Sequence, residues 1–188
     1  MASIRLVITF IVLVFTSNAL AAPVQWTVAD GGNDHYYDVI NEPYFWIAAA
    51  SVAMNQTHQG VDGHLATITS VEENLFLYDT FGSDALDHKW LGGRQLSTAS
   101  GPEDGWGWIT GEQWDYTNWG TGQPDDNLVS EERLQFDAQY ITASEGVGWN
   151  DADKDLQFGY VVEYPVPEPA SVTLLAIGST LLLRRRRV

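Results

Sequence analysis

The chain has 188 residues, with 25 acidic and 9 basic residues and a formal net charge of −16 at pH 7. Five of the basic residues lie near the termini, so residues 23–166 carry four basic against twenty-four acidic residues. Such a charge repels phosphate backbones and anionic lipid, which argues against nucleic-acid and membrane-surface binding. The chain has no cysteine, which excludes disulfides, thiol catalysis and Cys-based zinc sites. Eight Trp, eight Tyr and seven Phe provide a large area for a packed core.

The first residues have the pattern of a secretory signal. Arg5 precedes an apolar run, Leu6 to Phe15, and Ala19-Leu20-Ala21 fits the small-x-small cleavage pattern. A transmembrane helix is the alternative, but ten apolar residues are too few to span about 30 Å of hydrocarbon. We therefore expect a signal peptide over 1–21 and an exported protein.

Two helices are predicted in the first half of the chain, after a strand over Gln25–Val28. Pro43 is expected to begin the first helix, because Pro is favoured at the first helical position. Ser70 and Glu73 form a capping box that starts the second helix. One apolar face is expected on each helix: Trp46, Ala49, Ala50, Ala53 and Met54 on the first, and Val71, Leu75 and Tyr78 on the second.

Short apolar runs follow, separated by Gly, Pro, Asn and Asp, which is typical of strands and turns. The runs are Trp90–Leu91, Trp106–Ile109, Leu134–Phe136 and Tyr160–Tyr164. Helices followed by strands indicate an α+β domain. Residues 111–155 are rich in Gly and polar residues and predict a long loop region, which Trp114, Trp119 and Trp149 are expected to pin to the core.

Side chains with oxygen atoms gather at two places in this loop region. One is Gln123-Pro124-Asp125-Asp126-Asn127 with Glu131, and the other is Trp149-Asn150-Asp151. Calcium takes six to eight oxygen ligands from carboxylates, amides and carbonyls, so this set is consistent with a calcium site. Asp and Asn are also common in ordinary turns, and spacing alone leaves both interpretations open.

Taken together, the segments resemble the C-type lectin-like domain, in the order of that family, from about Val24 to Tyr164. The matching segments are Trp46 with Ala49, Gly63 to Ile68, Ser70 with Glu73-Asn74, Trp90 to Gly93, Trp106 to Trp108, Thr110 to Glu112, Tyr116 to Trp119, Gly122 to Asp125, Trp149 to Asp151, and Tyr160 to Tyr164. The resemblance implies an α+β domain over 24–164, with two helices packed on short antiparallel sheets.

The resemblance also implies a calcium site, at which the ion binds two adjacent sugar hydroxyls. The family's ligands fall on Gln123, Asp125, Glu131, Asn150 and Asp151. Pro124 matches a proline that is cis in the family, and Trp149 matches a core anchor. The Gln-Pro-Asp triplet is similar to the galactose-type form of the site, but Asn127 stands where galactose-binding relatives carry a stacking aromatic residue. The family's cysteine positions fall on Ala53, Arg133, Lys154 and Val162.

The last residues resemble the PEP-CTERM sorting signal of certain Gram-negative bacteria. Val166-Pro167-Glu168-Pro169 precedes an apolar run, Ala170 to Leu183, and then four arginines, Arg184 to Arg187. The resemblance implies that residues 165–188 are cut by an exosortase, which passes the protein to the cell surface or extracellular matrix. A plain C-terminal anchor helix is the alternative, and a membrane contact is expected only through this segment.

Catalysis is not expected. The four histidines, His35, His58, His64 and His88, show no paired metal-ligand spacing, although a two-carboxylate glycosidase needs only two acids. The sequence therefore predicts a calcium-dependent binder of extracellular polysaccharide or glycan. A structural or protein-interaction module of the envelope without sugar binding remains the alternative.

Overall fold

The structure is a computed structural model that describes residues 22–96, 99–127 and 130–166. The signal segment 1–21 and most of the C-terminal segment, from 167 on, therefore lie outside the described residues. Among the residues that are described, no helix is both long and apolar enough to cross a membrane.

The main element is an eight-stranded sheet in the order β1-β2-β10-β6-β8-β9, with β5 also paired to β10 and β7 to β6. Its strands are β1 (Val24–Gln25), β2 (Tyr36–Phe45), β5 (His64–Leu65), β6 (Lys89–Gln95), β7 (Trp106–Trp108), β8 (Arg133–Thr142), β9 (Gly146–Ala152) and β10 (Gln157–Tyr164). The central strand β10 is antiparallel to β2 and β5 and parallel to β6. A separate two-stranded ribbon joins β3 (Thr57–His58) to β4 (Val61–Asp62).

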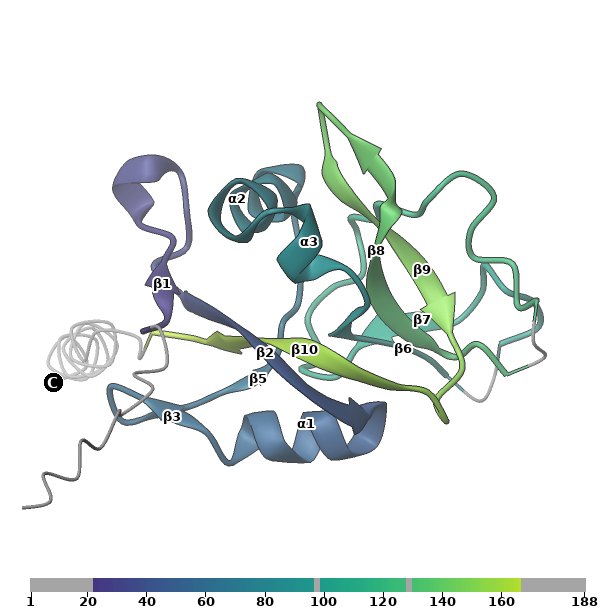
Figure 1. The fold of residues 1–188 in the computed structure, drawn as a ribbon, viewed down its shortest axis with the longest axis horizontal. Helices are drawn as coiled ribbons and strands as arrows, with labels where there is room; N and C mark the ends of the chain where they lie inside the picture. Colours follow the sequence, from purple (N-terminus) through teal and green to yellow (C-terminus); the bar gives the residue numbers. More distant parts are fainter. Residues whose placement is uncertain (1–21, 97–98, 128–129, 167–188) are drawn as a thin grey trace, which may run out of the picture.

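Helices cover both faces of this sheet (Figure 1). The helix α1 (Trp46–Met54) lies on one side, and α2 (Val71–Phe81) and α3 (Ser83–Leu86) lie on the other, while a short 3-10 turn, Val28–Asp30, follows β1. The core is accordingly divided in two: Trp46 and Trp90 belong to one cluster, and Leu77 and Trp149 to the other. The α+β prediction and the predicted fold class are confirmed.

The first helix begins three residues later than predicted. Pro43 lies near the end of β2, and Phe45 is the N-cap of α1. The β2–β10 register is interrupted where Tyr160 pairs with Ile40 and Phe158 with Tyr44. Pro43 therefore lies in an irregular part of the ladder, which is where a residue without a backbone N–H is tolerated in a strand. Four of the five predicted core residues of this helix are buried, but Met54 is 58% exposed.

The second helix begins as predicted, with the Ser70 hydroxyl accepting the backbone N–H of Glu73. Its buried face was predicted wrongly, because Val71, Leu75 and Tyr78 are only half-buried. The buried residues are Glu73, Asn74 and Leu77. Two polar residues take core positions here because each has specific hydrogen-bond partners in the core, which no helical periodicity of apolar residues indicates.

Two further differences concern strands. The first strand is Val24–Gln25, and the chain turns into the 3-10 turn before Val28. The predicted loop region, 111–155, contains the hairpin of β8 and β9. The other apolar runs lie in strands β6, β7, β8 and β10, as predicted, although most of these strands extend beyond the runs.

Candidate functional site

The candidate site is built on the edge strand β9 and the loop that precedes β8. Asp151 lies in β9, opposite Leu134 of β8, and is 1% exposed. One of its carboxylate oxygens accepts the backbone N–H of Asp125 at 3.2 Å, and the other accepts that of Asp126 at 2.8 Å. Asp126 in turn accepts the N–H of Glu131 at 3.2 Å. The buried carboxylate of Asp151 thus holds the loop before β8 against β9. The hydrogen bond between Asp126 and Glu131 joins the two ends of that loop.

Three of the predicted ligands meet as a result. Asp125, Glu131 and Asp151 each offer a carboxylate oxygen, and these oxygens lie within 4.8 Å of one another. Two ligands on opposite sides of a calcium ion, each about 2.4 Å from it, are about 4.8 Å apart. Among the described residues, this is the only such group of three acidic or histidine side chains. Its spacing fits one divalent ion.

The two predicted amide ligands flank this group along the chain. Gln123 is joined to Pro124 by a cis peptide bond, as the family resemblance implied. Its Nε2 donates to the Tyr140 hydroxyl at 3.0 Å, and its Oε1 is a buried oxygen with no hydrogen-bond partner in the part of the chain that the structure describes. Asn150 donates from Nδ2 to the backbone carbonyl of Asp151 at 2.6 Å. Calcium binds amide carbonyl oxygens as well as carboxylates, so Oε1 of Gln123, which is unpaired among the described residues, is of the donor type that the ion takes.

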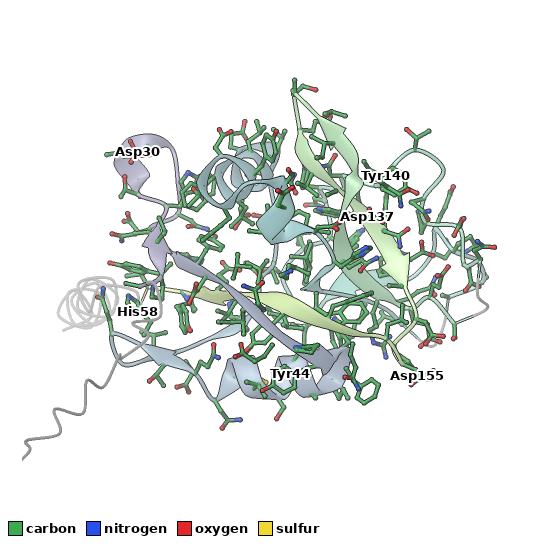
Figure 2. All side chains as sticks on the ribbon, viewed as in Figure 1. Asp30, Tyr44, His58, Asp137, Tyr140 and Asp155 are labelled. Carbon is green, nitrogen blue, oxygen red and sulfur yellow. The ribbon has the colours of Figure 1, made fainter. Side chains whose placement is uncertain are left out.

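Tyr140 was not predicted as part of the site. It lies on β8, and Figure 2 shows it on the hairpin of β8 and β9. Its hydroxyl oxygen accepts a hydrogen bond from Gln123 Nε2. The Oε1 end of that amide is therefore the end left to bind a ligand. Its ring lies so close to Gly120 that a Cβ there would be 2.2 Å from it. No local pattern in the sequence indicates this role, because Tyr140 is 17 residues from Gln123.

Burial raises the pKa of the Asp151 carboxyl above its usual value. The backbone N–H groups of Asp126 and Asp125 act in the opposite direction, because they stabilise the charged form. The charge of Asp125 adds to the upward shift. A bound cation would reverse this balance by favouring the ionised carboxylates, so the electrostatics of the group also fit an ion.

Trp149 anchors β9 beside the site. It is fully buried, its Nε1 donates to Asn74 Oδ1 at 3.0 Å, and its backbone pairs with both Asn118 and Gly120 at 2.8 Å. Four further tryptophan and tyrosine rings lie against it: Trp108, Trp114, Tyr116 and Trp119. The prediction that tryptophans pin this region to the core is confirmed.

A second set of charged groups is buried between α2, β2 and β10. Glu163 lies 2.6 Å from His35 Nδ1 and accepts the N–H of Thr67, while Tyr37 donates to Glu73. Burial, and then the charge of Glu163, raises the pKa of Glu73 to about 7. Burial also acts to raise the pKa of Glu163, but the hydrogen bond from His35 and nearby positive charge hold it below its usual value.

No family model matches the chain. It is 32% identical over 126 residues to Snaclec EMS16 subunit alpha of Echis multisquamatus, which covers 64% of this chain and 74% of the snaclec. It is 27% identical over 172 residues to Halomucin of Haloquadratum walsbyi, covering 79% of this chain. It is also 33% identical over 97 residues to C-type lectin domain family 4 member F of Rattus norvegicus, covering 50% of this chain. The chain spans only 2% of Halomucin and 16% of the rat protein.

Solved structures with the same fold include CEL-I, a C-type lectin from Cucumaria echinata (TM-score 0.59, 24% identity, 72% of this chain and 94% of CEL-I). The C-type carbohydrate-recognition domain of cow CD23, solved in the presence of a GlcNAc2Man3 oligosaccharide, has a TM-score of 0.55 at 25% identity (71% and 89%). A calcium-independent type II antifreeze protein has a TM-score of 0.55 at 26% identity (79% and 97%). Neighbours of this fold thus include both a carbohydrate-recognition domain and a calcium-independent protein.

Proposed function

Because this chain belongs to the C-type lectin-like family, we propose that it is a calcium-dependent carbohydrate-binding module. The observation that carries the proposal is the convergence of Asp125, Glu131 and Asp151 to within 4.8 Å. The sugar is supported by relatives whose names describe lectins, and by the CD23 domain solved with an oligosaccharide. Domains of this fold are typically binding modules, and we propose no catalytic step.

In this proposal, calcium is held by Gln123, Asp125, Glu131, Asn150 and Asp151. The ion supplies positive charge that attracts sugar hydroxyl oxygens. The carboxylates accept hydrogen bonds from those hydroxyls, and the amides of Gln123 and Asn150 can donate to them. The Gln-Pro-Asp triplet favours a galactose-type preference, while the exposed Asn127 leaves the sugar without a stacking aromatic residue at that position.

The terminal segments complete the proposal. We propose that residues 1–21 direct export, that 24–164 form the binding domain, and that 165–188 are removed by an exosortase. The partner would then be an extracellular polysaccharide or glycan at the surface or in the matrix of a Gram-negative bacterium. The strongly acidic charge of the domain is compatible with a neutral glycan and with divalent cations.

The test is sugar binding by the purified protein, measured by calorimetry with galactose and mannose in calcium and in EDTA. Binding is expected in calcium only, with galactose preferred. Asp125→Asn should weaken sugar binding at least about tenfold. Even residues that only orient the ligands of a metal site typically contribute this much to metal affinity, and Asp125 is proposed to bind the ion directly. The matched control is Asp115→Asn, which removes one exposed acid outside the carboxylate group. Equal loss in both variants, or binding in EDTA, would contradict the proposal.

A structural or protein-interaction module is the second candidate, because two observations favour it. A calcium-independent antifreeze protein has the same fold at 26% identity, and Asn127 replaces the expected stacking residue. In that case the ion, if bound, would only order the loop. Unfolding in calcium and in EDTA, measured beside the sugar titrations, separates the candidates: a calcium-induced gain in stability with no binding of any sugar in a panel of neutral and acidic glycans would support this second function.

A further inference from the structure

Three of the four basic residues between positions 23 and 166 are linked through Arg133, which faces Arg94 on the neighbouring strand and shares a pocket with Lys154. Arg94 of β6 is directly opposite Arg133 of β8, and Arg133 and Lys154 line one surface pocket. Like charges opposite each other on neighbouring strands are destabilising. An anion bound among these cations would relieve this cost.

The pocket has a volume of about 390 Å³ and combines cations with exposed apolar side chains. Phe45 is 43% exposed and Ile47 is 72% exposed at the start of α1. The Arg133 guanidinium lies 5.0 Å from the centre of the Trp46 ring, so it is held in place by a cation–π contact. Lys154, by contrast, is exposed.

Two acidic side chains contact these cations. Glu132 Oε2 is 3.4 Å from Arg133 Nη1, and Asp155 Oδ2 is 3.5 Å from Lys154 Nζ. The Asp155 side chain is 78% exposed, and Figure 2 shows it at the connection between β9 and β10. Exposed pairs of this kind contribute little to stability. A ligand carboxylate can therefore take the place of Asp155 beside Lys154.

The chemistry of the pocket limits its ligand. Arginine binds carboxylates through paired hydrogen bonds, and the apolar face of a sugar ring can lie against Phe45 and Ile47. The volume is at the lower end for small-molecule sites, which suits one ring. A ligand with many negative charges would be repelled by the acidic surface of the rest of the domain. A single carboxylate on a ring is favoured.

Residues that line the pocket are close in sequence to two of the candidate calcium ligands. Glu131 is two residues before Arg133, and Asp151 is three residues before Lys154. The Ser130 hydroxyl donates to Asp153 at 3.1 Å, which ties the two segments together. The same two chain segments therefore carry residues of both the candidate calcium site and the pocket.

We propose that the pocket lined by Phe45, Ile47, Arg133, Lys154 and Asp155 binds the carboxylated ring of a uronic-acid unit in an otherwise neutral glycan, with the ligand carboxylate replacing Asp155 beside Lys154. This inference rests on the proposed sugar-binding function and adds a second subsite to it. The pocket needs no ion, so its binding is independent of calcium.

The experiment titrates the purified protein with galacturonate in EDTA at low salt, following the Trp46 indole N–H by NMR. The methyl ester of galacturonate is the matched neutral probe. Galacturonate should shift the Trp46 signal and its ester should bind at least about fivefold more weakly. Lys154→Gln should weaken galacturonate binding about two- to fivefold, and Asp155→Asn should strengthen it by a similar factor, since exposed charge contacts are of this size.

Arg133→Gln should abolish binding, and Arg133→Lys, which keeps the charge, should restore part of it. Equal binding of acid and ester, or no response to Lys154→Gln and Asp155→Asn, would overturn the site. A blocked glutamate peptide that binds as tightly as galacturonate would overturn the assignment to a sugar. Calcium-dependent binding of neutral sugar, measured in parallel on Lys154→Gln, reports the proposed function separately, so either can fail alone.

Discussion

Replacing Glu73 with glutamine should remove much of the pH dependence of stability between pH 5 and pH 7. Burial and the neighbouring Glu163 raise the pKa of Glu73 to about 7 in the folded protein, from an ordinary value of 4.5. The folded state therefore binds more protons than the unfolded state in this interval. The contribution of Glu73 to stability is therefore largest below about pH 4.5 and is lost as the pH rises toward 7.

The magnitude follows from these two values. Linkage gives a loss of about 2 kcal/mol of unfolding free energy between pH 5 and pH 7 from Glu73 alone. Burial acts to lower the pKa of His35, but its hydrogen bond to Glu163 raises it on balance. His35 therefore adds a loss of the same sign as the pH rises past its folded pKa, and that part should remain in Glu73→Gln. The lowered pKa of Glu163 acts below this interval, because its contribution is lost as the pH falls under 4.5.

The assay is urea unfolding in EDTA at pH 5, 6 and 7, for wild type, Glu73→Gln and Glu72→Gln. Glu72 is the adjacent residue of the same helix and is exposed, so its substitution makes the same change of charge without removing a buried group. Wild type and Glu72→Gln should lose stability in parallel, and Glu73→Gln should lose about 2 kcal/mol less. Parallel loss in all three proteins would refute the burial argument.

Three further substitutions test how the site is supported. Trp149→Phe leaves Asn74 Oδ1 without its donor and should cost about 1–3 kcal/mol in chemical denaturation; an unchanged midpoint would contradict the anchor. Tyr140→Phe removes the acceptor for Gln123 Nε2 and should lower calcium affinity about tenfold, whereas unchanged affinity in calorimetry would mean that this contact does not orient the ligand. Gly120→Ala places a Cβ 2.2 Å from the Tyr140 ring and should lower thermal stability by about 1–3 kcal/mol, a loss that should be absent if the ring can move aside.

Local signals predicted the start of α2 and the strands that carry apolar runs, β6, β7, β8 and β10. The start of α2 is fixed by a hydrogen bond between Ser70 and Glu73, which are only three residues apart in sequence. The apolar runs lie in strands. The face of α2 was predicted wrongly because burial of Asn74 depends on Trp149, 75 residues away. The strand β2 was missed because its ten residues mix polar and apolar side chains and are held by β10.

The candidate site likewise combines residues that the sequence indicated with contacts that only the tertiary structure shows. Family resemblance placed Asp125, Glu131 and Asp151 in one site, and the structure brings their carboxylates together. The loop contacts that gather them, from Asp151 to the backbone N–H groups of Asp125 and Asp126, follow from tertiary structure and have no pattern in the sequence. Tyr140 could not be predicted for the same reason.

Unfolding of the purified protein in EDTA and in millimolar calcium, with magnesium as the control ion, tests the calcium site most directly. At about a hundred times its dissociation constant, an ion bound only by the folded state adds roughly 2.7 kcal/mol to the unfolding free energy. A calcium-selective gain of this size is expected in wild type and in Asp115→Asn, and its loss is expected in Asp125→Asn. An unchanged unfolding free energy in wild type would mean that the three carboxylates hold the loop without an ion, and would contradict calcium-dependent binding.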